Sequence, residues 1–187
     1  MNHIATVALM LNLGVAGVYA QQKPVKMTFS GTFEPSPINL QPGTNNDEEN
    51  FAGSGTLGTF TFRSLRADNA SPQPSSTCSG PTRLYFTSVA GAGVFRFQDG
   101  SLLAVRLTQG AVCIDLAVSQ GRFTVIYQIT GGTGRFKNAS GTLTLTDTVF
   151  PVLYDASNAP VFFAVTGEFT GTVFGVAIEE EHQDERH

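Results

Sequence analysis

A glycine-rich corner between two alternating segments constrains the fold of this chain more than any other feature. Apolar and polar residues alternate in Arg122–Thr130 before the corner and in Gly141–Phe150 after it, which is the period of a β-strand. Glycine tolerates positive φ and close backbone approach, so the pattern predicts a bulged hairpin or a barrel corner. A phosphate-binding loop would need a helix after the glycines, whereas a strand follows here. The structural glycines of the corner are Gly131, Gly132, Gly134 and Gly141.

Residues 131–141 read Gly-Gly-Thr-Gly-Arg-Phe-Lys-Asn-Ala-Ser-Gly. This resembles the signature of the allene oxide cyclase and dirigent barrels, Gly-Gly-(Ser/Thr)-Gly-x-Phe-x-x-(Ala/Val)-x-Gly, and the resemblance covers residues 126–150. It implies a closed, antiparallel barrel of about eight strands with an apolar interior. The acidic catalytic residue of that family lies outside the matched stretch, so the resemblance assigns no active-site residue to this chain.

The rest of the sequence also predicts an all-β fold, because short strand-like runs alternate with turn residues and no helical period appears after the N-terminal segment. Tight turns are expected at Asp99-Gly100, Gln109-Gly110 and Gln120-Gly121. Two segments, Glu34–Ala52 and Ala67–Pro81, are expected to be loops. The predicted strands are Val25–Phe33, Gly55–Arg63, Thr82–Ser88, Gly93–Gln98, Ser101–Thr108, Ala111–Ser119, Arg122–Thr130, Gly141–Phe150 and Val161–Val176.

The N-terminal segment of the chain predicts export. Residues 4–17 are apolar and Val18-Tyr19-Ala20 fits a small-x-small cleavage site, so residues 1–20 are interpreted as a signal peptide. The domain organisation expected is a signal peptide (1–20), a β-barrel domain (21–178) and an acidic disordered tail (179–187). The mature protein is expected to be secreted, extracellular or periplasmic, without a membrane span.

An exported chain favours a disulfide between its two cysteines, Cys78 and Cys113, and two free thiols are the alternative. The alternation around Cys113 places this bond on the outer wall.

The formal net charge of −4 comes entirely from the acidic tail, because acidic and basic residues are equal in number in the rest of the chain. Because no basic stripe is present, the sequence argues against nucleic-acid binding.

The histidines exclude several kinds of chemistry. His3 lies in the signal peptide, and His182 and His187 lie in the acidic tail, so the barrel domain has none. A Ser–His or Cys–His nucleophile pair and a His-ligated metal site are therefore not expected, and neither a metal nor a cofactor is predicted.

The inward face of the two strands at the corner supplies the candidate ligand-binding residues. Among them, Asp147 and Tyr127 are the only polar groups and are weak candidates for catalysis. A carboxyl group inside the barrel would be desolvated and its pKa raised, which suits an acid or base. The alternative is that Asp147 sits at a wet strand end and that Tyr127 bonds a backbone group. The candidate ligand-binding residues are Phe123, Val125, Tyr127, Leu143, Leu145 and Asp147.

Three functions are consistent with this pattern. The first is binding of a small apolar or aromatic ligand without chemistry, supported by 15 phenylalanines and an alternating interior. The second is an extracellular scaffold whose barrel is filled by its own side chains. The third, implied by the resemblance, is a cofactor-free cyclase or isomerase that holds an apolar substrate. Homo-oligomer formation is left open.

Overall fold

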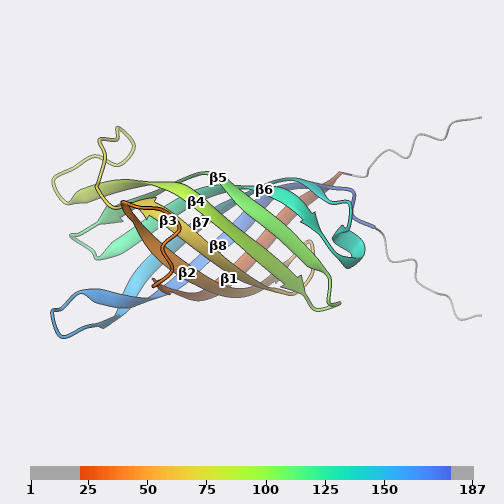
Figure 1. The fold of residues 1–187 in the computed structure, drawn as a ribbon, viewed down its shortest axis with the longest axis horizontal. Helices are drawn as coiled ribbons and strands as arrows, with labels where there is room; N and C mark the ends of the chain where they lie inside the picture. The colour runs from red at the N-terminus through yellow and green to blue at the C-terminus, as the bar shows by residue number, and fades with distance from the viewer. Residues whose placement is uncertain (1–21, 178–187) are drawn as a thin grey trace, which may run out of the picture.

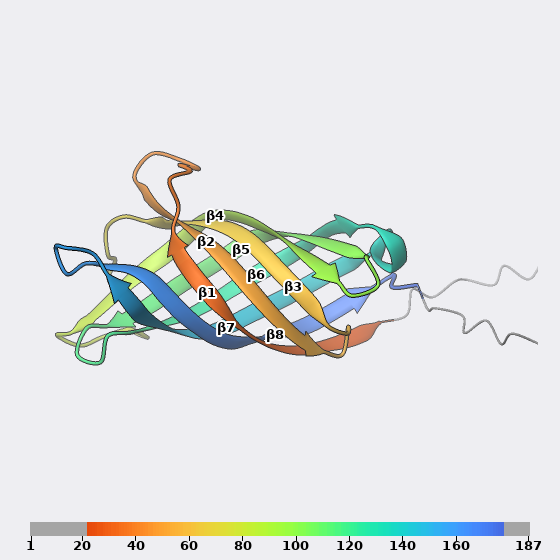
Figure 2. The same cartoon turned by 90° about the horizontal axis from the view of Figure 1, so that it is seen from below.

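A closed barrel of eight antiparallel strands makes up the computed structural model, which describes residues 22–177 (Figures 1 and 2). Each strand pairs with its neighbour in sequence, and β1 closes the barrel by pairing with β8. The predicted all-β barrel is therefore confirmed. The predicted signal peptide (1–20) and acidic tail (179–187) lie outside the described residues. The elements are β1 (Lys23–Pro35), β2 (Thr44–Gly55), β3 (Phe60–Asn69), β4 (Arg83–Phe97), β5 (Leu102–Asp115), β6 (Gln120–Gly132), a short 3₁₀ helix η1 (Gly134–Phe136), β7 (Ser140–Tyr154) and β8 (Pro160–Phe174).

The two ends of the barrel differ. One end carries η1, the start of β1 and the end of β8 (Figure 1, right), and we call it the closed end. The other, the open end, carries the connections 36–43, 70–82, 116–119 and 155–159 (Figure 1, left). The long strands of the β7–β8 hairpin extend past the start of β6, whose pairing with β7 begins at Gly121 and Val149.

Phenylalanine rings fill the half of the interior next to the closed end. They come from alternate positions of the strands, because successive side chains point to opposite faces of a sheet. Phe62 and Phe95 have ring centroids 4.4 Å apart, and Phe97 packs at 4.7 Å on Phe136 of η1. This half of the barrel, the Phe-packed half, is a conventional core. Its buried rings are Phe29, Phe51, Phe60, Phe62, Phe95, Phe97, Phe136 and Phe169.

The predicted corner is confirmed. Gly134 has φ +56° and opens the single 3₁₀ turn that carries Phe136 into the barrel. At Gly132 any Cβ would collide with the backbone carbonyl of Leu102 on β5, so the close approach of the two strands requires glycine here. The corner thus closes one end of the barrel with a buried aromatic ring.

One strand was missed by the sequence prediction. Residues 34–52 were expected to be a loop, but β2 occupies Thr44–Gly55, and only residues 36–43 connect it to β1. The side chains of Asp47 and Glu49 point inward in register with Phe51, so the inner face of β2 begins with charged residues. A search for apolar alternation does not recognise such a strand. The predicted strand Gly55–Arg63 accordingly joins the end of β2 to the start of β3.

Two predicted turns were wrong. Gln109-Gly110 lies inside β5, where the register against β6 shifts between Leu107 and Gln109, so it forms a β-bulge rather than a turn. Gln120-Gly121 begins β6, and the actual turn is at 116–119. The predicted strand Ala111–Ser119 is also too long, because β5 ends at Asp115 and the alternation that would point Leu116 and Val118 inward stops there, which leaves both side chains exposed. The Asp99-Gly100 turn is confirmed, with Gly100 at φ +82°.

The predicted disulfide is confirmed. Cys78 and Cys113 are bonded with their Cα atoms 5.7 Å apart, which ties the connection 70–82 to the outer wall at β5.

Within residues 22–177 we find no helix of the length and hydrophobicity needed to cross a bilayer.

Candidate functional site

Charged side chains form a layer across the barrel between the Phe-packed half and the open end. The inward positions of β3 change from Phe60 and Phe62 to Ser64 and Arg66. The guanidinium of Arg66 donates to the carboxylate of Glu49 through Nη1, and its Nε donates to Asp68 Oδ2 at 3.3 Å. Ser64 donates to the same Glu49 carboxylate. Arg66 is only 1% exposed, so these contacts hold a charge that would be very costly to bury alone.

Three further groups in this layer have strongly shifted pKa values. Burial raises the pKa of Asp147 to about 7, and the negative charge of Glu49 acts in the same direction. Burial likewise raises the pKa of Asp47 to about 7, although the positive charge of Arg66 opposes the shift. Burial, followed by the charge of Glu49, also raises the pKa of the Tyr127 hydroxyl well above its ordinary value. Asp47 and Asp147 are therefore the two carboxyl groups of the layer whose pKa values lie near neutral pH.

The charge layer has more acceptors than donors. Four buried carboxyl groups face one guanidinium, which corresponds to a formal charge of −3 when all are ionised. Within residues 22–177, Asp147 Oδ1, Asp68 Oδ1 and the hydroxyls of Tyr127 and Ser88 are buried without a hydrogen-bond partner. Buried polar atoms of this kind are uncommon and call for a structural or functional explanation. The buried charged residues are Asp47, Glu49, Arg66, Asp68 and Asp147.

An apolar cavity of about 420 Å³ lies between the charge layer and the open end, and we call it the mouth cavity. Phe33 of β1 packs on Phe163 of β8, with ring centroids 4.6 Å apart, and more loosely on Phe123 of β6, at 6.0 Å. Phe123 also contacts the charge layer, because the Arg66 guanidinium carbon lies 4.0 Å from its ring centroid. The main lining residues are Phe33, Ile114, Gly121, Phe123, Val149, Tyr154 and Phe163.

The predicted site residues are distributed over three levels of the barrel. Phe123 lines the mouth cavity, whereas Asp147 and Tyr127 belong to the charge layer. Asp147 lies in the middle of β7 and is only 7% exposed, so it is not at a wet strand end. Val125, Leu143 and Leu145 are fully buried in the core, below the mouth cavity.

Sequence reasoning missed most of the charge layer. Asp47 and Glu49 lie on the strand that was predicted as a loop, and Arg66 and Asp68 lie beyond the predicted end of the next strand at Arg63. The period of two does continue from Phe62 through Ser64 and Arg66, so the sequence contained a signal that these side chains point inward. Their polarity concealed it, because inward strand positions are normally expected to be apolar.

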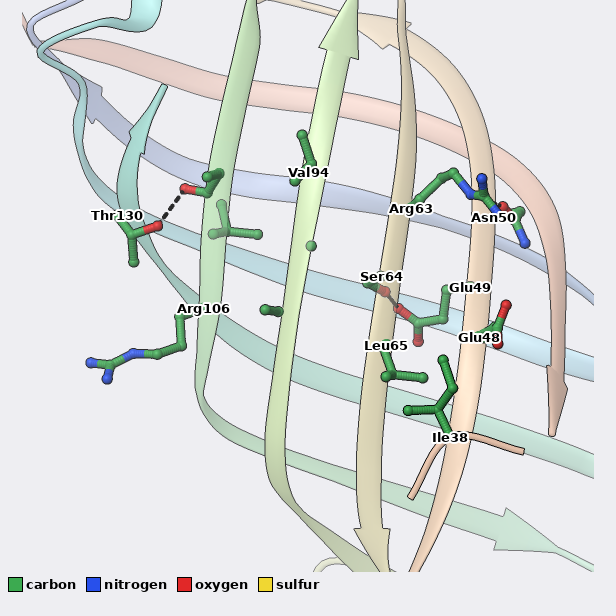
Figure 3. A pocket seen from close by; sticks show the side chains of 14 residues that line it. Ile38, Glu48, Glu49, Asn50, Arg63, Ser64, Leu65, Val94, Arg106 and Thr130 are labelled. Carbon is green, nitrogen blue, oxygen red and sulfur yellow. Dashed lines mark hydrogen bonds between the residues drawn. The ribbon is translucent and has the colours of Figure 1, made fainter. Parts of the chain in front are cut away.

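A second hollow lies on the outer wall over strands β2 to β5, with Ile38 of the connection 36–43 next to Leu65 at one side (Figure 3). It has a volume of about 580 Å³ and a floor of small apolar side chains flanked by Arg63 and Arg106. Arg63 donates to Asn50 at 2.8 Å, and Thr130 donates to the Ala104 carbonyl. The polar groups of this outer hollow are exposed or paired with one another, so the mouth cavity is the stronger candidate site.

In the described part of the chain no cluster of three or more His, Cys, Asp or Glu side chains could hold a metal ion.

The geometry defines a small closed β-barrel with one apolar mouth above a buried charge layer. No family model matches the chain, and no curated protein matches it. Among solved structures it is similar to the pterocarpan synthase dirigent protein GePTS1, at 12% identity and a TM-score of 0.45, over 92% of this chain and 100% of that one. It is also similar to the pterocarpan synthase dirigent protein PsPTS1, at 12% identity and a TM-score of 0.42, over 86% and 99% of the two chains.

Both of these structures are dirigent proteins, the group whose signature the corner resembles. The closed antiparallel barrel that the sequence predicts is established by the strand pairing of this chain itself. At this level of similarity the function must be argued from the chain's own residues.

Proposed function

We propose that this protein binds a small apolar or aromatic molecule in the mouth cavity. The observation that carries the proposal is the division of the barrel interior. Side chains fill the half next to the closed end, while about 420 Å³ remains at the open end, between Phe33, Phe123 and Phe163. A cavity of this size, with a mainly apolar lining and polar groups at one side, is typical of small-molecule sites.

The surroundings of the cavity support uptake from solution. The β5–β6 turn and the end of β7 border the cavity and expose Leu116, Leu153 and Tyr154. Exposed apolar side chains next to an apolar cavity are typical of ligand-binding grooves. Export, predicted from the N-terminus, would place such a binder outside the cell, where the Cys78–Cys113 disulfide is stable.

Binding of a fluorescent apolar probe tests this proposal. We expect saturable uptake of the neutral probe 2-naphthalenemethanol by the folded protein. Gly121 lines the cavity, and a Cβ there would make ordinary contacts of 3.6–3.7 Å with Phe123, Val112 and Val149. Gly121→Leu should therefore fill the cavity without backbone strain and reduce probe affinity at least about tenfold.

Ala117→Leu is the matched control, because Ala117 is exposed in the neighbouring turn and the substitution places the same leucine side chain outside the cavity. Loss of binding in Gly121→Leu but not in Ala117→Leu supports the mouth cavity. Absence of saturable binding in the parent protein would instead favour the scaffold function.

Acid–base chemistry on the bound molecule is the second candidate function. It is favoured by one observation: Asp147 has a pKa of about 7 and a carboxyl oxygen without a partner, next to Phe123 of the cavity. A group with this pKa can give or take a proton near neutral pH. Asp147→Asn should then abolish turnover of a bound substrate while retaining its binding, and unchanged turnover would remove Asp147 from this role.

A further inference from the structure

We propose that the ligand of the mouth cavity carries a cationic nitrogen, which binds against the carboxyl group of Asp147. This inference rests on the proposed function and specifies its ligand class: an amphipathic amine with an aromatic or aliphatic body. The body occupies the apolar cavity, and the N–H groups of the ammonium reach the acceptors that the barrel leaves without partners.

The first support is the presence of unpartnered acceptors. Within residues 22–177, Asp147 Oδ1 and the Tyr127 hydroxyl are buried and make no hydrogen bond. Tyr127 is 1% exposed and Asp147 is 7% exposed, and both side chains point into the barrel. An ammonium group has three donors and no acceptor, so it complements such a set better than a hydroxyl or a carboxylate does.

The second support is the sign of the local charge. The titratable groups of the layer are Asp47, Glu49, Asp68, Asp147 and Tyr127, and Arg66 is its one cation. Arg66 already donates to two of these acids, through Nη1 to Glu49 and through Nε to Asp68. The excess negative charge therefore repels an anionic ligand and attracts a cation, and a low-dielectric interior strengthens both effects.

The third support is position. Asp147 is directly opposite Phe123 in the pairing of β7 with β6, and both side chains point inward. Opposite residues of an antiparallel pair have Cβ atoms about 5 Å apart. Phe123 lines the mouth cavity, so the carboxyl group lies next to the cavity wall.

A matched set of naphthalene probes tests the inference: 2-naphthylmethylamine, 2-naphthalenemethanol and 2-naphthoate. They share one apolar body and carry a cationic, a neutral and an anionic head. Affinities are measured by fluorescence at pH about 8, above the pKa of about 7 of Asp147, where the carboxylate is ionised. Because hydrogen bonds to charged groups are roughly twice as strong as neutral ones, we expect the amine to bind at least about tenfold tighter than the alcohol. The naphthoate should bind most weakly.

Asp147→Asn should remove most of the preference for the amine and leave the affinity of the alcohol nearly unchanged. The control is Glu168→Gln, which neutralises an acid on the outer wall, 3.9 Å from Lys26, and should leave the preference intact. Circular dichroism checks that each variant is folded. The preference should also shrink as pH falls below about 7, because Asp147 becomes protonated.

Equal affinities for amine and alcohol would overturn the inference while leaving the proposed function standing. The same conclusion would follow if Asp147→Asn kept the full preference. If none of the three probes bound, both the inference and the proposed function would fall.

Discussion

The guanidinium of Arg66 lies 4.0 Å from the ring centroid of Phe123, and this contact joins the buried charge layer to the mouth cavity. A guanidinium over an aromatic face is a favourable arrangement, stronger when both groups are desolvated. The contact also explains how an apolar cavity can lie next to five buried charged residues. The ring of Phe123 has the guanidinium over its face, and the same residue lines the cavity.

Arg66→Met should destabilise the protein by about 3–5 kcal/mol, because it leaves Glu49 and Asp68 without their cation in a buried site. Arg63→Met is the matched control, since Arg63 is exposed on the same strand and bonds only to Asn50 among the contacts observed. Urea denaturation at neutral pH measures both. Similar losses of unfolding free energy in the two variants would contradict a special role for the charge layer.

Stability should fall as pH rises from about 4 to about 7. Asp47 and Asp147 have folded-state pKa values of about 7, above an ordinary value of 3.8. The folded state therefore binds more protons than the unfolded state in this window, and raising the pH favours unfolding. Each acid contributes at most about 4 kcal/mol, at 1.36 kcal/mol per pKa unit.

The variant Asp147→Asn tests the assignment of this pH dependence. It removes one of the two titrations, so its stability should decline less steeply between pH about 4 and about 7 than that of the parent protein. Thermal melts across this range provide the measurement. An identical pH profile in the variant would show that Asp147 does not titrate in the folded barrel as we infer.

Removing the disulfide with the double substitution Cys78→Ala and Cys113→Ala should cost roughly 4 kcal/mol. The bond closes a segment of 35 residues, and chain entropy relates that length to the loss. Guanidinium denaturation of the two proteins gives the difference. We expect the barrel to remain folded, because the strand pairing that closes it does not depend on the connection 70–82. An unfolded double variant would contradict this expectation.

Phe136→Ala should destabilise the barrel by about 3–5 kcal/mol, because it removes the ring that closes one end and packs on Phe97. Phe174→Ala is the control, since this ring is partly exposed near the end of β8. Chemical denaturation distinguishes the two. A loss below 1 kcal/mol for Phe136→Ala would show that the corner does not seal the core.

The barrel was predictable from sequence because most of its strands alternate apolar and polar residues, and the glycines identify the corner. The interior orientation of Asp147 and Tyr127 was also predictable from their phase with apolar neighbours. The strand β2 was not, because Asp47 and Glu49 occupy inward positions where a pattern search expects apolar residues. Their burial depends on Arg66, which is distant in sequence and becomes a neighbour only when β2 pairs with β3.

The extent of the cavity could not be derived from alternation either. Phe123 and Val125 have the same phase on β6, yet the first lines the mouth cavity and the second is buried in the core. Which level of a barrel is filled depends on the volumes of side chains from several strands together. Phase along one strand does not contain that information.

The central claim is that the barrel interior divides into a filled half and a ligand-binding mouth. An isotope-filtered nuclear Overhauser experiment with bound 2-naphthalenemethanol tests this claim most directly. We expect cross-peaks from the naphthalene protons to the methyl groups of Ile114 and Val149, which line the mouth cavity. Cross-peaks to Leu143 and Leu145, which are packed below it, should be absent. Contacts to the two leucines without contacts to Ile114 and Val149 would contradict the placement of the site at the open end.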